Sequence, residues 1–300
     1  MEDAIRKGRA GNRPVRVSPK RVRRHSPKMI AAQCTIIFFT VVLLVFQFIP
    51  IYITVAKSFK NLEQDFLNPY GLTFPFAWSN YEFAWDMVKS LFLNTFILAF
   101  ANVFGTLALS SLGAFAFVRF KFPFKETIFT AILAIMMIPG TLTLVAQFML
   151  VDSLSLLHTR WAVILPTIAG NSSFNIFLLR TFFGGVSGEV LEASEIDGAS
   201  KFRQFWNFML PLSLPIVFTA GLMLFMQSWN DLIWPMLVLK EEHYTIATGL
   251  LPFTTEYYRM TNSYTVPMAG YVLSSIPLLV IFFFTSKQFI SGLTSGAFKM

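Results

Sequence analysis

The sequence Glu192-Ala193-Ser194-Glu195-Ile196-Asp197-Gly198-Ala199, followed by Leu210-Pro211, lies in a short polar segment between two long apolar segments. Together with Glu189, it places four carboxylates within about ten residues. A membrane protein rarely carries so many charges in a short connection between two apolar segments unless those charges have a function. The stretch therefore predicts a contact surface rather than a simple connection.

Local signals predict that this stretch is a short helix. Ser187 stands at a favourable N-cap position, and Glu189 and Glu192 fall in the first two turns, where the helix dipole favours anions. Gly198 stands where a helix would end with a left-handed residue, and Ser200 can cap the next helix. We expect a short helix held between two supports; the alternative is an ordinary capped loop.

The composition indicates an integral membrane protein. Of the 300 residues, 55% are hydrophobic and 13% are charged, about half the charged fraction of soluble domains. The single cysteine, Cys34, excludes an intrachain disulfide. The histidines His25, His158 and His243 fall in separate regions, so no metal site and no catalytic set is predicted.

Six charge-free runs of at least 19 residues predict six transmembrane helices, since a helix needs roughly 20 residues to cross the hydrocarbon core. The runs are 29–56, 90–118, 127–151, 161–179, 204–230 and 260–286. The predicted fold class is therefore all-α integral membrane. Residues 80–85 are expected to form a short amphipathic helix on the outer surface; the alternative is an ordinary packed loop.

The basic residues predict the orientation. With the N-terminus inside, the inner segments carry 18 Lys and Arg and the outer segments carry six, so both termini are expected to be cytoplasmic. Residues 1–28 hold ten of these basic residues against two acidic ones. We interpret them as a disordered cytoplasmic tail that contacts anionic membrane lipid, in preference to a nucleic-acid-binding arm. The six-helix membrane domain would span 29–290, and 291–300 would be a C-terminal cytoplasmic tail.

Polar and helix-breaking residues within the runs suggest a solute path. Pro139 interrupts the third run, and broken helices often mark the path in transporters, although many membrane prolines serve packing alone. Asn171 and Asn175 could line a polar path or form hydrogen bonds between helices. Trp229-Asn230-Asp231 lies about 30 Å along the fifth run, near its outer end. Asp231 could line an outer gate, brace the following loop, or cap the helix.

At these motifs the sequence resembles the permease subunits of ATP-binding-cassette (ABC) importers, above all the carbohydrate importers of the maltose-permease type. Their signature is Glu-Ala-Ala, three residues, Gly, nine residues, an apolar residue, any residue, then Leu-Pro. Here it reads Glu192-Ala193-Ser194, Gly198, Phe208 and Leu210-Pro211, with Ser in place of the second Ala. The usual Pro before the signature is absent at Val186-Ser187, and Met300 stands where Gly is common.

Further family-like motifs occur in order along the chain. They are Asn94-Thr95, Ala114 to Arg119, Ile138-Pro139, Phe177 to Phe183, Asp197-Gly198-Ala199, Trp229-Asn230-Asp231 with Pro235, and Gly292 to Lys299.

The resemblance implies that residues 188–199, within a coupling segment 186–206, dock on a cytoplasmic ATPase subunit. The residues implied in coupling are Glu192, Ala193, Ser194, Ile196, Asp197, Gly198 and Ala199. The implied substrate path includes Asn94, Pro139, Asn171, Asn175, Trp229 and Asn230. Asp231, Tyr244 and Tyr257 would form an outer gate or contact a binding protein.

The resemblance also implies the partners. They are a second permease subunit, two ATPase subunits and an extracellular or periplasmic solute-binding protein, in the plasma membrane of a prokaryote. This chain has no phosphate-binding Gly-x-x-x-x-Gly-Lys-[Ser/Thr] loop, so no cofactor is expected on it, and ATP and Mg are expected on the partner ATPases.

Several functions compete with sugar import. Glycerol phosphate or another small polar solute is an alternative substrate, but no Lys or Arg lies within a run to bind a phosphate. An ion-driven secondary transporter would carry ionisable groups at membrane depth, and the six runs contain none. An intramembrane enzyme would need a catalytic constellation at that depth, and none is evident.

Overall fold

The computed structural model describes the backbone of residues 27–297 and the side chains of residues 31–285. All regular elements within these residues are helical. The predicted N-terminal tail 1–28 lies almost entirely outside the described residues, and so do the side chains of the predicted C-terminal tail 291–300.

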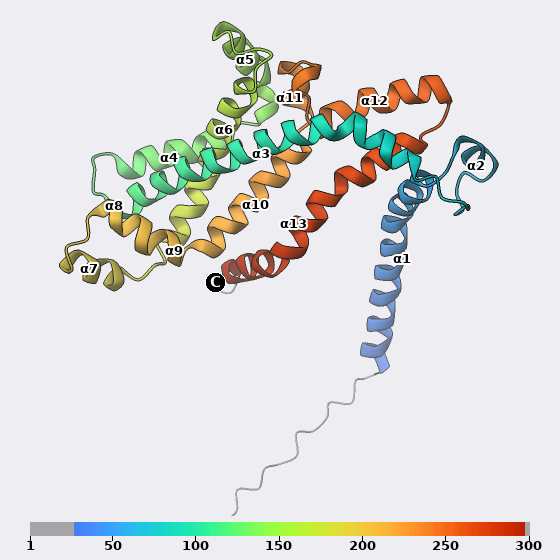
Figure 1. Cartoon of the computed structure of the whole chain (residues 1–300). Coiled ribbons are helices and arrows are strands. Elements are labelled where there is room, and N and C mark those ends of the chain that lie inside the picture. Colours follow the sequence, from blue (N-terminus) through green and yellow to red (C-terminus); the bar gives the residue numbers. More distant parts are fainter. Residues whose placement is uncertain (1–26, 298–300) are drawn as a thin grey trace, which may run out of the picture. The chain divides into compact units, whose positions relative to one another are not determined.

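The helices follow one another in the order shown in Figure 1. They are α1 (Pro27–Ser58), α2 (Leu62–Leu67), α3 (Ser79–Arg119), α4 (Lys125–Met136), α5 (Gly140–Ser153), α6 (Trp161–Phe183), α7 (Gly188–Ile196), α8 (Lys201–Gln204), the π-helix η1 (Phe205–Met209), α9 (Leu210–Leu212), α10 (Leu214–Asn230), α11 (Ile233–Val238), the 3₁₀-helix η2 (Glu241–His243), α12 (Ile246–Thr261) and α13 (Thr265–Ala297).

Four helices are long and apolar enough to cross a membrane: α1, α3, α6 and α13. Two further spans exist if each of two sharply bent helix pairs is counted as one. These pairs are α4 with α5, bent by 97°, and the segment Lys201–Leu212 with α10, bent by 79°. The helical class is confirmed, and the described part of the chain holds four to six candidate spans.

The predicted break at Pro139 is confirmed, because α4 ends at Met136 and α5 begins at Gly140. Residues 80–85 are helical, as predicted, but they do not form a short helix of their own: α3 begins at Ser79 and runs without interruption to Arg119. The first turns of α3 carry charged side chains, so the sequence did not reveal that they continue into the apolar run 90–118. In one pair of them, the Lys89 ammonium lies 2.8 Å from the Asp86 carboxylate, one helical turn away, which suits a helix.

The predicted sixth run, 260–286, is divided between the end of α12 and α13.

The chain divides into two units, residues 1–51 and 52–300. In the first unit the described residues belong to α1, whose apolar side chains, such as Phe38 and Leu43, are largely exposed. In a membrane protein such a surface suits contact with lipid or with another helix.

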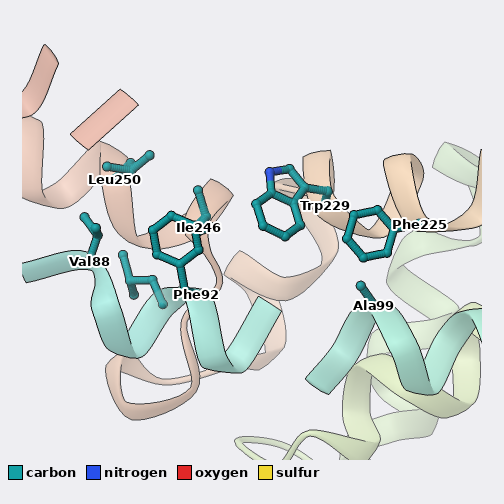
Figure 2. Packing of buried hydrophobic residues seen from close by; sticks show 8 residues of the cluster. Val88, Phe92, Ala99, Phe225, Trp229, Ile246 and Leu250 are labelled. Atoms are coloured by element: carbon teal, nitrogen blue, oxygen red, sulfur yellow. The ribbon is translucent and has the colours of Figure 1, made fainter. Parts of the chain in front are cut away.

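In the second unit, α3 is the central helix, and α6, α10, α12 and α13 all pack against it. Close approach to α6 is possible because Gly105 has no side chain; a Cβ there would overlap Ile168. Figure 2 shows one core cluster, in which Val88, Phe92 and Ala99 of α3 meet side chains of α10 and α12. Trp229 of α10 contributes the largest of these side chains.

A buried polar network joins the end of α1, α2, the start of α3 and the turn before α13. The carboxylate of Asp65 accepts hydrogen bonds from the Lys57 ammonium and the Ser263 hydroxyl, both at 2.8 Å. The side-chain amide of Asn80 donates to the carbonyls of Ser58 and Lys60, at 2.9 and 2.7 Å. These bonds fix the termini of helices that lie far apart in the sequence.

We predict that Asp65→Ala destabilises the protein strongly, because it leaves Lys57 and Ser263 without their buried partner. Breaking a buried ion pair by removing one member costs about 3–5 kcal/mol. Thermal unfolding of the purified protein in detergent measures the effect, with exposed Asp86→Ala as the control. Equal melting temperatures for the two variants would contradict the prediction.

Candidate functional site

The acidic stretch forms a helix, α7, that is anchored on one side and exposed on the other. Leu191 is buried in a cluster with Phe115 of α3, Phe183 of α6 and Met209 of η1. Ser194 is also buried, and its hydroxyl donates to the Leu191 carbonyl at 2.7 Å. The helix therefore has a fixed inner face, which packs against α3, α6 and η1.

The end of α7 has the hydrogen bonds of a Schellman motif. The N–H of Gly198 donates to the carbonyl of Glu195 at 3.0 Å, and the N–H of Ala199 donates to that of Ser194 at 2.9 Å. Gly198 has a φ of 80°, in the left-handed region that glycine adopts without strain. The prediction for Gly198 is confirmed. Ser200 caps α8 through the N–H of Arg203, as predicted, whereas the Ser187 side chain makes no capping hydrogen bond.

A polar network holds this turn against α3. Arg119, the last residue of α3, donates to the Glu195 carboxylate at 3.2 Å and to the Gln204 side-chain carbonyl at 3.3 Å. Gln204 is fully buried and also donates to the Leu191 carbonyl at 3.2 Å. The ammonium of Lys201, 2.7 Å from Glu195, holds the pKa of that carboxyl below its usual range. No local sequence signal predicts this network, because Arg119 lies 76 residues from Glu195.

The outer face of α7 carries the other residues predicted for coupling. Glu192, Ala193, Asp197 and Gly198 are exposed, and the Ile196 side chain is 87% exposed. Ser194 lies on the buried face, and Ala199 is half-buried in the closing turn. An exposed Ile flanked by carboxylates on an anchored helix is suited to contact a groove with apolar and basic groups.

The residues predicted for the substrate path lie in different places. Asn171 lines a cavity between α5, α6 and α10, and Pro139 directly precedes its lining residue Gly140. Asn175 is buried and bonds to the Asn171 carbonyl of its own helix at 2.8 Å. Trp229 lies in the core cluster of Figure 2. Asn230 is exposed and bonds to the Met226 carbonyl.

Asn94 joins distant segments. Its side-chain amide donates to the carbonyls of Glu242 and Tyr244, at 2.9 and 3.2 Å, and its side-chain oxygen accepts from Arg160 at 2.9 Å. These bonds tie α3 to the residues that precede α6 and α12. The contacts give Asn94 a structural role in this conformation.

The three residues predicted for an outer gate do not line one common cavity. Tyr244 and Tyr257 line a mostly apolar cavity of about 570 Å³ between α3 and α12, together with Phe83 and Glu241. Asp231 lines the cavity that contains Asn171. Sequence reasoning missed Gln147, Thr167 and Gln227, which line that same cavity. Their polarity within apolar runs was the signal that could have found them.

Residues 109–294 match the family described as "Binding-protein-dependent transport system inner membrane component". The chain is 30% identical over 254 residues to the probable ABC transporter permease protein YurM of Bacillus subtilis, covering 83% of each chain. It is 30% identical over 262 residues to the maltodextrin transport system permease protein MalD of Streptococcus pneumoniae, covering 83% of this chain and 89% of that one.

A crystal structure of a bacterial ABC transporter involved in the import of the acidic polysaccharide alginate has the same fold. One of its chains superposes with a TM-score of 0.77 at 22% identity, covering 87% of this chain and 98% of that one. The chain belongs to the family of inner membrane components of binding-protein-dependent transport systems, which are the permeases of ABC importers. It is thus a multi-pass membrane protein and a transport subunit, as the resemblance predicted.

Proposed function

We propose that this chain is the permease subunit of an ATP-driven sugar importer and that α7 is its coupling helix. The observation that carries the proposal is the construction of α7. Leu191 and Gly198 fix the helix, while Glu192, Ala193 and Ile196 remain exposed. A rigid helix with an unpartnered outer face can transmit a displacement to the helices on which it rests.

The proposed path of that displacement runs through two contacts. Leu191 packs in the cluster formed with side chains of α3, α6 and η1. Arg119, at the end of α3, is hydrogen-bonded to Glu195 near the end of α7. Since α6, α10, α12 and α13 pack against α3, a movement of α3 reaches most of the second unit. Interlocked helices move as bodies because packed cores are not continuously deformable.

The proposed assembly contains this chain, a second permease, two ATPase subunits that bind ATP and Mg, and a solute-binding protein. In this assembly the chain has six spans, each bent pair counting as one, with both termini and α7 on the cytoplasmic side. The 18 to six distribution of basic residues supports this orientation. The chain itself hydrolyses no ATP.

A neutral sugar or oligosaccharide is the proposed substrate. The match to a maltodextrin permease over most of both chains supports this class. The Asp197-Gly198-Ala199 and Trp229-Asn230-Asp231 motifs agree with it. The proposed substrate path follows Pro139, Asn171 and Asn175, and Tyr244 and Tyr257 form the proposed contact with the binding protein.

The proposal predicts that Glu192→Lys abolishes solute-stimulated ATP hydrolysis while the complex still forms in the membrane. Reversing the charge of a residue central to an interface costs about 2 kcal/mol or more, which is about thirtyfold in affinity. ATPase activity and solute uptake of the complete importer in proteoliposomes measure the effect. The control is Glu63→Lys, which reverses an exposed glutamate of α2. Wild-type coupling in Glu192→Lys would refute the role of α7.

A further inference from the structure

The cavity between α5, α6 and α10 has the groups of a hydroxyl-binding site. Its volume is about 260 Å³, just below the range of about 300–1,000 Å³ for small-molecule sites. The lining residues are Gly140, Leu144, Gln147, Pro166, Thr167, Gly170, Asn171, Gln227, Asp231 and Trp234. A second cavity of about 540 Å³ adjoins it and shares Gly140, Gln147, Gly170 and Asn171. The two cavities adjoin beside the break in the α4–α5 pair, and their walls combine polar with apolar groups.

One polar atom in this space lacks a partner. Gln227 of α10 donates to the side-chain oxygen of Asn171 of α6 at 3.1 Å. The nitrogen of the same Asn171 side chain is buried and makes no hydrogen bond within the described residues. A buried donor without a partner is unfavourable. A rotation of the Asn171 side chain would bring this nitrogen to the cavity surface, where a ligand oxygen can accept from it.

Asp231 offers the complementary acceptor. Its carboxylate accepts a hydrogen bond from the main-chain N–H of Trp234, which orients it at the end of α10. Trp234 is itself fixed, because its indole N–H donates to the Ala162 carbonyl at 3.0 Å. A carboxylate has about four acceptor positions, so one backbone N–H leaves Asp231 able to accept from a ligand hydroxyl.

Two glycines make room for the ligand. A Cβ placed on Gly140 or on Gly170 would meet no atom within 4 Å. Neither glycine is therefore required by close packing of the chain itself. Both leave backbone groups accessible from the cavity, where a ligand can approach them closely.

The charges of the cavity select the class of ligand. Among the described residues that line the two cavities, none is Lys, Arg or His, and Asp231 is the sole ionisable group. Phosphates and carboxylates are bound in proteins by cationic or clustered N–H donors, and a fixed carboxylate repels them. Neutral hydroxyl groups, which both donate and accept, match the side-chain amides and Asp231.

We infer that Asn171, Gln227 and Asp231 form a binding site on this chain for one unit of an uncharged polyhydroxy ligand. The inference rests on the proposed function, and it assigns recognition of the transported sugar to this subunit rather than to the partner permease alone. Gln147 and Thr167 line the same space and complete its polar wall. The site accepts neutral sugars and rejects phosphorylated or acidic ones.

The test uses the complete importer with its binding protein in proteoliposomes. ATP-driven uptake is measured for neutral oligosaccharides of glucose, galactose or arabinose and for sn-glycerol 3-phosphate. The variants are Asn171→Leu and Gln227→Leu, which remove an amide at similar volume. Gly170→Val fills the cavity and leaves both amides in place. Gln47→Leu, an exposed glutamine of α1, is the matched control.

We expect the wild-type importer to take up a neutral oligosaccharide. Asn171→Leu and Gln227→Leu should each lower kcat/KM by about tenfold or more, the effect of losing one hydrogen bond to a buried group. Gly170→Val should also lower kcat/KM, because its side chain occupies the space of the ligand. Gln47→Leu should stay within about twofold of wild type. The binding protein is unchanged in all variants, so a difference in uptake reports on the permease.

Neutral-sugar uptake at the wild-type rate in the cavity variants would overturn the inference while leaving the proposed function intact. Preferred uptake of sn-glycerol 3-phosphate by the wild type would overturn both the inference and the proposed sugar substrate. Failure of the proposed function gives a different pattern, in which uptake of every probe by the wild type is independent of ATP.

Discussion

Gly198→Val should abolish ATP-driven uptake, whereas Gly198→Asn should retain most of it. Gly198 has a φ of 80°, a conformation that costs an ordinary L-residue about 1–2 kcal/mol and a β-branched residue more. Asn is the residue that best tolerates this region after Gly. Valine should therefore open the turn and shift α7 on its support.

Comparing the two variants distinguishes the effect of the backbone conformation at position 198 from the effect of side-chain size. Nothing lies within 4 Å of a Cβ placed on Gly198, so added bulk alone causes no clash. Uptake and ATPase activity in proteoliposomes measure the outcome, with equal amounts of assembled complex confirmed first. Equal loss in both variants would show that the side chain blocks a contact, and equal activity would show that the turn is irrelevant.

Leu191→Asp should uncouple hydrolysis from transport, since it places an unpaired charge in the cluster that supports α7. Leu191 is 2% exposed and packs among side chains of α3, α6 and η1. Burying an unpaired carboxylate is strongly unfavourable, so α7 is expected to detach from this cluster. Leu191→Met conserves volume and should cost less than about 1.5 kcal/mol.

The readout for Leu191 is the ratio of solute transported to ATP hydrolysed by the reconstituted importer. We expect this ratio to fall in Leu191→Asp and to stay near the wild-type value in Leu191→Met. A normal ratio in Leu191→Asp would show that the contact of α7 with the cluster does not transmit force.

The sequence predicted the helical elements well where the signals are local. Charge-free runs located the apolar helices, Pro139 located the break, and Gly198 and Ser200 located the turn after α7. Each of these signals depends on a few neighbouring residues. The start of α3 was missed because its polar first turns carry no apolar run, although they continue the helix.

The arrangement of the site was harder to predict, because it depends on contacts between distant segments. Periodicity alone did not tell which face of the nine-residue α7 is buried, so Leu191 and Ser194 were not recognised as its inner face. Arg119 reaches Gln204, 85 residues away, and Gln227 reaches Asn171, 56 residues away. Such pairs follow from the packing of α3, α6 and α10.

The central claim is that the outer face of α7 contacts the ATPase, and site-specific crosslinking tests it most directly. Single cysteines replace Ile196, on the exposed face, and Ser194, on the buried face, after Cys34→Ser removes the native thiol. In the assembled importer, a short thiol-reactive photocrosslinker at position 196 should capture the ATPase subunit, and the same reagent at position 194 should not. Capture at neither position, or capture at 196 of a protein other than the ATPase, would contradict the account.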